Sequence, residues 1–132
     1  MPEVNWLAVV AATIATFVVG GLWYSPLLFS KAWQREAGLS DEQIRGASMA
    51  RIFAGAFALT FVAASVFAFF LGPDSGLAFG ASTGFAAGLG WVASALGVLY
   101  LFERRTLKLW LINGGYNVAA FTVIGAVIGA IG

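Results

Sequence analysis

Four long apolar stretches dominate the pattern of hydrophobic and polar positions along the chain. They run from Val4 to Tyr24, from Met49 to Leu71, from Leu77 to Phe102 and from Leu109 to Ile131. A membrane-spanning helix needs about 20 mainly apolar residues, and each stretch has that length. The sequence therefore predicts an all-α integral membrane protein, with one four-helix transmembrane domain over residues 1–132.

The segment after the first span predicts a short interfacial helix. Ser25 followed by Pro26 is a typical helix start, with serine as the cap and proline at the first helical position. Phe29 and Trp33 then lie on one side and polar residues on the other. We therefore expect an amphipathic helix over residues 26–37 that lies in the headgroup layer.

Two further connections separate the spans. Residues 40–43 read Ser-Asp-Glu-Gln, a capping-box pattern, and we expect the helix that follows Ser40 to run without a break into the second span. Residues 72–76 read Gly-Pro-Asp-Ser-Gly, which is typical of a turn. The second and third spans therefore form a tight helical hairpin.

Composition excludes several classes of protein. The chain is 61% hydrophobic and 10% charged, whereas a soluble domain is about 25% charged. It contains no His and no Cys, which removes a histidine general base, thiol chemistry, disulfides and the commonest metal ligands. We therefore expect no catalytic residue, no metal and no cofactor, and we do not expect an enzyme.

The basic residues predict the orientation in the membrane. All seven lie in or beside the two loops that follow the first and third spans: Lys31, Arg35, Arg45, Arg51, Arg104, Arg105 and Lys108. The opposite side, which holds both termini and residues 72–76, has none. The positive-inside rule then places both basic loops in the cytoplasm and both termini outside. Because orientation explains these charges, no nucleic-acid partner is expected.

Glycines at a spacing of four predict close helix packing. The third span carries Gly76, Gly80, Gly84 and Gly88, and the fourth carries Gly125 and Gly129. In a bilayer, small residues favour helix association because they let two backbones approach closely. This glycine zipper is expected to meet another helix, either within the subunit or across an oligomer. A glycine-lined pathway is the alternative.

A small set of uncharged polar groups lies inside the spans. Asn113, Tyr116 and Asn117 share one face of the fourth span, and Trp91 has an indole N–H that needs an acceptor, for which Asn117 is a candidate. These residues either form hydrogen bonds between helices or line a ligand or pore site. No carboxylate lies near the middle of any span, which disfavours a proton-coupled exchanger. Four aromatic residues are expected to act as interface anchors: Trp23, Tyr24, Trp33 and Trp110.

Several segments resemble one known family over essentially the whole chain. They are NWLAVVAA, GGLWYSPLLFSKAWQ, GLSDEQIRG and LYLFERRTLKLWLINGGYN. They are similar to bacterial membrane proteins catalogued as domain-of-unknown-function family 1761. The resemblance implies a small four-span protein of the bacterial inner membrane, and it implies no activity.

Two functional hypotheses follow. The first is a non-enzymatic accessory component that binds lipid, a small ligand or a partner protein. It is expected to act as a homo-oligomer of parallel subunits, with a dimer as the first expectation. The second is a small oligomeric channel or transporter whose polar path runs near Asn113, Tyr116 and Asn117.

Overall fold

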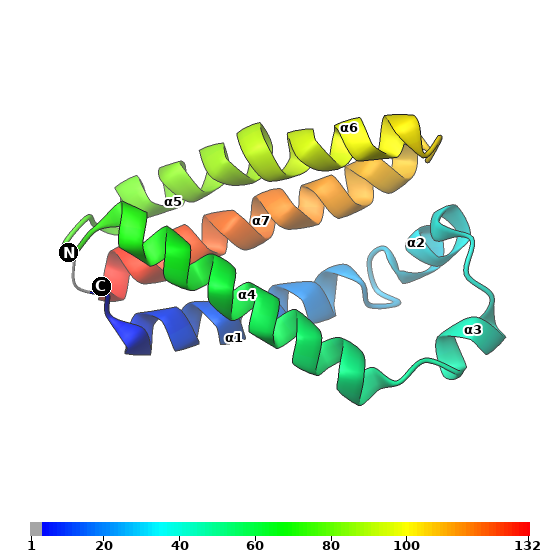
Figure 1. Cartoon of the computed structure of the whole chain (residues 1–132), viewed down its shortest axis with the longest axis horizontal. Helices are drawn as coiled ribbons and strands as arrows, with labels where there is room; N and C mark the ends of the chain where they lie inside the picture. The colour runs from blue at the N-terminus through cyan, green and yellow to red at the C-terminus, as the bar shows by residue number, and fades with distance from the viewer. Residues whose placement is uncertain (1–3) are drawn as a thin grey trace.

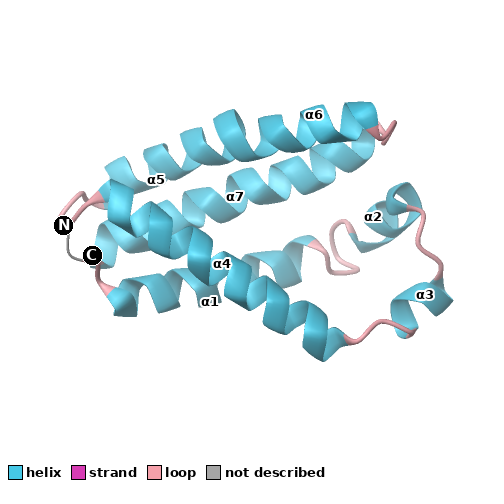
Figure 2. Cartoon of the chain, viewed as in Figure 1, coloured by secondary structure: helices cyan, strands magenta, loops and turns pink. Residues whose placement is uncertain are grey.

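The part of the chain that the structure describes consists of helices joined by turns and loops (Figures 1 and 2). The computed structural model covers residues 4–132, and over that range it contains helices and no strand. Four helical stretches are long and apolar enough to cross a membrane: Trp6–Trp23, Met49–Leu71, Leu77–Phe102 and Leu107–Ile131. The prediction of an all-α protein with four candidate spans is confirmed.

The ends of these spans follow local capping chemistry. The first is α1 (Trp6–Trp23), where the Asn5 side chain accepts a hydrogen bond from the Ala8 N–H. The second is α4 (Met49–Leu71), as predicted. The fourth is α7 (Leu107–Ile131), which begins two residues before the predicted start because the Thr106 hydroxyl accepts from the Leu109 N–H at 3.1 Å.

The third span has the predicted ends but is not a uniform α-helix. It consists of α5 (Leu77–Ala87), the π-helical segment η1 (Gly88–Ala93) and α6 (Ser94–Phe102). The Ser94 hydroxyl donates to the Leu89 carbonyl, five residues back, at 2.9 Å. Single π-helical turns of this kind occur frequently at functional sites.

The interfacial helix is shorter than predicted. Helix α2 covers Ser30–Ala37, and residues 26–29 form turns instead of its first turn. The Ser25 hydroxyl does not cap α2, because it donates to the Leu22 carbonyl at the end of α1, at 2.7 Å. The backbone N–H groups of Leu28 and Ser30 donate to the Ser25 carbonyl, so the chain turns sharply before α2 begins.

The expectation of an unbroken helix from Ser40 into the second span is wrong. The capping box forms as predicted, and it starts the short helix α3 (Asp41–Arg45). Gly46 ends this helix, and Ser48 caps α4 through its side chain, which accepts from the Arg51 N–H. Glycine is a poor helix former and serine competes with the helix for backbone hydrogen bonds, so this sequence favours a break.

Helix α7 is the centre of the bundle. Helices α1, α2, α4, α5 and α6 all contact it. Helix α4 starts near α3, away from α5 and α6, crosses α1 and α7, and ends at the hairpin turn beside α5 (Figure 1). At the hairpin end, the Asp74 N–H donates to the Gly132 carbonyl at 3.2 Å. Both ends of the described chain and the hairpin turn therefore lie together, and the basic loops lie at the opposite end.

Helices α5 and α7 are in backbone contact through glycines. Gly80, Gly84 and Gly88 are all buried against α7. A Cβ atom at Gly80 would overlap the Gly125 carbonyl, and one at Gly84 would overlap the Phe121 carbonyl. These residues therefore pack within one chain, which leaves their zipper face no room for a second subunit.

Gly76 and Gly129 extend the same contact in a different way. A Cβ at Gly129 would overlap the Gly76 carbonyl, whereas the Cβ position of Gly76 itself is open. Gly76 has a φ of 91°, which favours glycine because L-residues with a side chain rarely adopt it. Gly76 thus serves the turn into α5, and Gly129 serves the helix contact.

Candidate functional site

A network of one amide and two tyrosines ties three spans together near the basic end. Tyr24, at the end of α1, donates its hydroxyl to Asn113 Oδ1 at 2.7 Å. Asn113 Nδ2 in turn donates to the Tyr100 hydroxyl of α6 at 2.9 Å. A single side chain of α7 therefore uses both ends of its amide to hold α1 and α6. This meets the requirement that a polar group inside a membrane finds partners in the protein.

Tyr116 and Asn117 complete this cluster on α7. The Tyr116 ring centre lies 5.3 Å from that of Tyr24, and a Cβ at Gly20 would lie only 3.3 Å from the Tyr116 hydroxyl. Asn117 Nδ2 donates to the Asn113 carbonyl at 2.8 Å, within its own helix. The structure thus brings Asn113, Tyr116 and Asn117 to one place, together with the two other tyrosines of the chain.

Glycines let two tryptophans reach backbone carbonyls beside the cluster. Trp23 donates to the Ile112 carbonyl at 2.9 Å, and its ring lies over Gly115, where a Cβ would approach it to 3.1 Å. Trp110 donates to the Ala93 carbonyl of η1 at 2.8 Å and lies beside Gly97. Both indoles are therefore bound to other helices of the chain.

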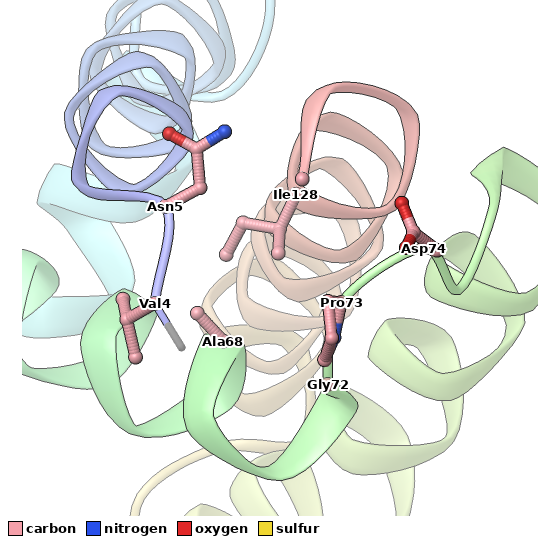
Figure 3. A pocket seen from close by; sticks show the side chains of 8 residues that line it. Val4, Asn5, Ala68, Gly72, Pro73, Asp74 and Ile128 are labelled. Carbon is pink, nitrogen blue, oxygen red and sulfur yellow. The ribbon is translucent and has the colours of Figure 1, made fainter. Parts of the chain in front are cut away.

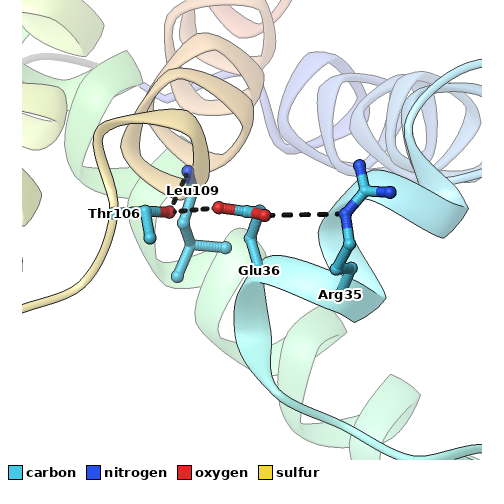
Figure 4. A network of polar contacts seen from close by, with 4 residues as sticks. All are labelled: Arg35, Glu36, Thr106 and Leu109. Carbon is cyan, nitrogen blue, oxygen red and sulfur yellow. Dashed lines mark hydrogen bonds and ion pairs between the residues drawn. The ribbon is translucent and has the colours of Figure 1, made fainter.

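Helix α2 covers the basic end of the cluster. The ring centre of Trp33 lies 5.9 Å from that of Tyr24 in an edge-on contact. Figure 4 shows the second attachment: the Thr106 hydroxyl donates to Glu36 Oε1 at 2.6 Å while it accepts from the Leu109 N–H. Arg35 pairs with Glu36 at 3.6 Å. The Glu36 carboxylate lies at the start of α7, where the helix dipole favours a negative charge.

Trp91 does not join the cluster. Its side chain is 78% exposed, and it makes no hydrogen bond with any of residues 4–132. The suggested hydrogen bond from Trp91 to Asn117 does not form in the structure, because the exposed Trp91 indole points to no acceptor among the described residues, and Asn117 Nδ2 donates within α7. Trp91 lines a different feature, a groove on the side of the bundle.

This groove lies between α4 and the third span and has a volume of about 840 Å³. It is lined almost entirely by apolar side chains: Ala63, Val66, Phe67, Phe70, Leu71, Phe79, Thr83, Ala86, Ala87, Trp91, Val92 and Phe121. Sequence reasoning missed it, because two spans joined by a tight turn are expected to pack along their length. The sequence feature that could have indicated the groove is the set of phenylalanines on both sides of the turn, whose bulky side chains now line it.

A smaller pocket of about 390 Å³ opens at the hairpin end (Figure 3). Val4 and Asn5 come from the start of α1, Ala68 from α4 and Ile128 from α7, while the turn contributes Asp74. Within residues 4–132, no three His, Cys, Asp or Glu side chains come together to hold a metal ion. The polar side chains of this pocket are the exposed Asp74 carboxylate and the Asn5 amide, which caps α1.

The fold and the cluster define a small helical membrane protein in which a half-buried amide–tyrosine network joins three of the spans. The chain belongs to the family described as "Protein of unknown function (DUF1761)", whose model matches residues 7–129. This match confirms the resemblance found in the sequence. No curated protein and no solved structure matches the chain.

Proposed function

We propose that this protein is a non-catalytic membrane component that holds a hydrophobic molecule from the bilayer in the groove between α4 and the third span. The observation that carries the proposal is the groove itself, with its volume of about 840 Å³ and its apolar wall. Sites for small hydrophobic ligands typically have about 300–1,000 Å³ and a mainly apolar lining.

The shape of the groove supports this proposal. Phe67 and Phe70 on α4 and Phe79 on α5 form bulky walls near the hairpin turn, while Ala86 and Ala87 leave space further along the third span. Large walls beside small residues create a recess that a flexible apolar chain can fill. In a bilayer such binding depends on close van der Waals contact, because lipid tails are as apolar as the protein surface.

The hydrogen bonds of the amide–tyrosine cluster favour this function over a channel. The side chain of Asn113 donates to Tyr100 and accepts from Tyr24, and Asn117 donates within α7. Groups bound to each other in this way serve to fix helix positions. A polar path along Asn113, Tyr116 and Asn117 would have to break these bonds first.

We further propose that the protein acts as a homo-oligomer of parallel subunits, first of all a dimer, in the inner membrane of a bacterium. Only 11% of the most apolar window of the third span is buried inside the chain, so most of its surface is free for another contact. Gly90 lies on this free surface, and nothing lies within 4 Å of a Cβ placed there. The basic loops are proposed to face the cytoplasm.

The experiment measures lipid retention by two matched variants. Ala87→Trp fills the groove, whereas Ala95→Trp adds the same side chain at an exposed position of α6 outside it. Each protein is reconstituted in nanodiscs of one phosphatidylethanolamine, released and weighed by native mass spectrometry. The proposal predicts that Ala87→Trp loses bound lipid and that Ala95→Trp keeps it. Equal lipid retention in both variants would contradict the proposal.

A further inference from the structure

Trp91 lies near the middle of the third candidate span, far from both of its ends. By the rise of a helix, Trp91 is about 21 Å from Leu77 and about 16 Å from Phe102, the two ends of the third span. The hydrocarbon core is about 30 Å thick, so this position is far from both headgroup layers. Neither water nor a lipid headgroup reaches the indole N–H at that depth.

Trp91 differs in its hydrogen bonding from the two tryptophans beside the amide–tyrosine cluster. Trp23 and Trp110 each donate to a backbone carbonyl of another helix, at 2.9 Å and 2.8 Å. Trp91 donates to none of the residues that the structure describes, although its side chain lines the groove. Thr83, the hydroxyl-bearing residue of the same lining, donates to the Phe79 carbonyl at 2.7 Å. Trp91 therefore supplies the free donor of this wall.

An unpaired N–H in hydrocarbon is costly, because a polar group transferred from water without a partner loses its hydrogen bonds. The N–H carries a partial positive charge, so a complementary occupant carries a partial negative charge at the same depth. A saturated acyl chain fills the groove but offers no such acceptor. Trp91 also belongs to the π-helical segment η1, a kind of irregularity that often marks functional sites.

We infer that the occupant of the groove is a long apolar molecule with a carbonyl or ether oxygen within its chain, and that this oxygen accepts a hydrogen bond from Trp91. The inference rests on the proposed function, and it names the ligand class for that groove. The apolar lining of the groove binds the hydrocarbon part of the ligand, and the Trp91 indole binds its oxygen atom.

The test observes the indole directly by NMR. The full chain is labelled with ¹⁵N-tryptophan in dodecylphosphocholine micelles, whose alkyl chains contain no carbonyl. The Trp91 signal is the one that disappears in Trp91→Phe. Titration with 9-heptadecanone should move the Trp91 indole proton downfield, and titration with heptadecane should not. Trp23 and Trp110, which already donate to carbonyls, serve as internal controls.

Binding constants give the second measurement. Trp91→Phe should weaken ketone binding about fivefold, the equivalent of one hydrogen bond, and leave alkane binding unchanged. If ketone and alkane shift the Trp91 signal equally, or Trp91→Phe affects both equally, the inference is overturned. It is also overturned if the free protein shows a downfield Trp91 signal that is lost on dilution, because a second copy then supplies the acceptor.

The outcomes separate this inference from the proposed function. If both compounds bind equally well and Ala87→Trp blocks both, the groove is a binding site but Trp91 does not select the oxygen. If neither compound binds, and Ala87→Trp retains as much lipid as the unmodified protein, the proposed function itself fails.

Discussion

Replacing Asn113 by leucine should loosen the attachment of α1 and α6 to α7. The substitution keeps the size of the side chain and removes both the acceptor for Tyr24 and the donor to Tyr100. A hydrogen bond between membrane helices contributes about 0.6 kcal/mol on average and up to about 1.7 kcal/mol. Two lost bonds, with two phenol hydroxyls left without their partner, should lower the free energy of unfolding by about 1–3 kcal/mol.

Asn117→Leu is the matched control for this prediction. It is the same chemical change one helical turn away, but it removes a bond within α7 instead of two bonds between helices. Its expected effect on the free energy of unfolding is below about 0.5 kcal/mol. Both variants are unfolded reversibly in mixed micelles with increasing dodecyl sulfate, and unfolding is followed by tryptophan fluorescence and circular dichroism.

The comparison can refute the reasoning directly. The α-helical content should stay unchanged in both variants, because the spans are held by their own backbone bonds. If Asn113→Leu is as stable as the wild type, the three spans are not tied by the amide. If Asn117→Leu is destabilised equally, the interhelical bonds have no special role.

Three further predictions follow from other contacts. Gly84→Val should lower the free energy of unfolding by about 3 kcal/mol, because a Cβ there overlaps the backbone of α7, whereas Gly90→Val, at an open position, should cost far less; denaturant titration decides between them. Glu36→Ala should release α2 from Thr106 and raise the maleimide labelling rate of a Leu109→Cys variant severalfold, and an unchanged rate would show that this contact does not hold α2. A single Asp74→Cys variant in this cysteine-free chain should react with membrane-impermeant maleimide from outside the cell only, and labelling from the cytoplasmic side alone would reverse the proposed orientation.

Local features of the fold could be predicted from the sequence because they depend on neighbouring residues. The four spans follow from continuous hydropathy, and the capping box at Ser40 follows from the residue types at its two ends. Two predictions were wrong for related physical reasons: the start of the interfacial helix at residue 26 and the unbroken helix from Ser40 through Gly46. In the first case the Ser25 hydroxyl bonds back to the Leu22 carbonyl of α1, and in the second Gly46 ends α3 and Ser48 caps α4. The local residues favoured these outcomes, but hydropathy alone did not reveal them.

The contacts of the candidate site could be predicted only in part. The shared face of Asn113 and Asn117 follows from helical spacing, but the partners Tyr24 and Tyr100 come from other spans, and their approach depends on how the helices pack. The groove was missed because it arises from the angle between α4 and α5. No local sequence pattern determines the angle between these two helices.

The measurement that tests the central claim most directly is photocrosslinking from the bilayer. The protein is reconstituted with a phosphatidylethanolamine that carries a diazirine in one acyl chain, irradiated and digested, and the adducts are located by mass spectrometry. The account predicts adducts concentrated on the groove lining, such as Phe67, Thr83 and Ala87, and their loss in Ala87→Trp. Adducts spread evenly over other exposed apolar residues, such as Leu22 and Val98, would contradict it.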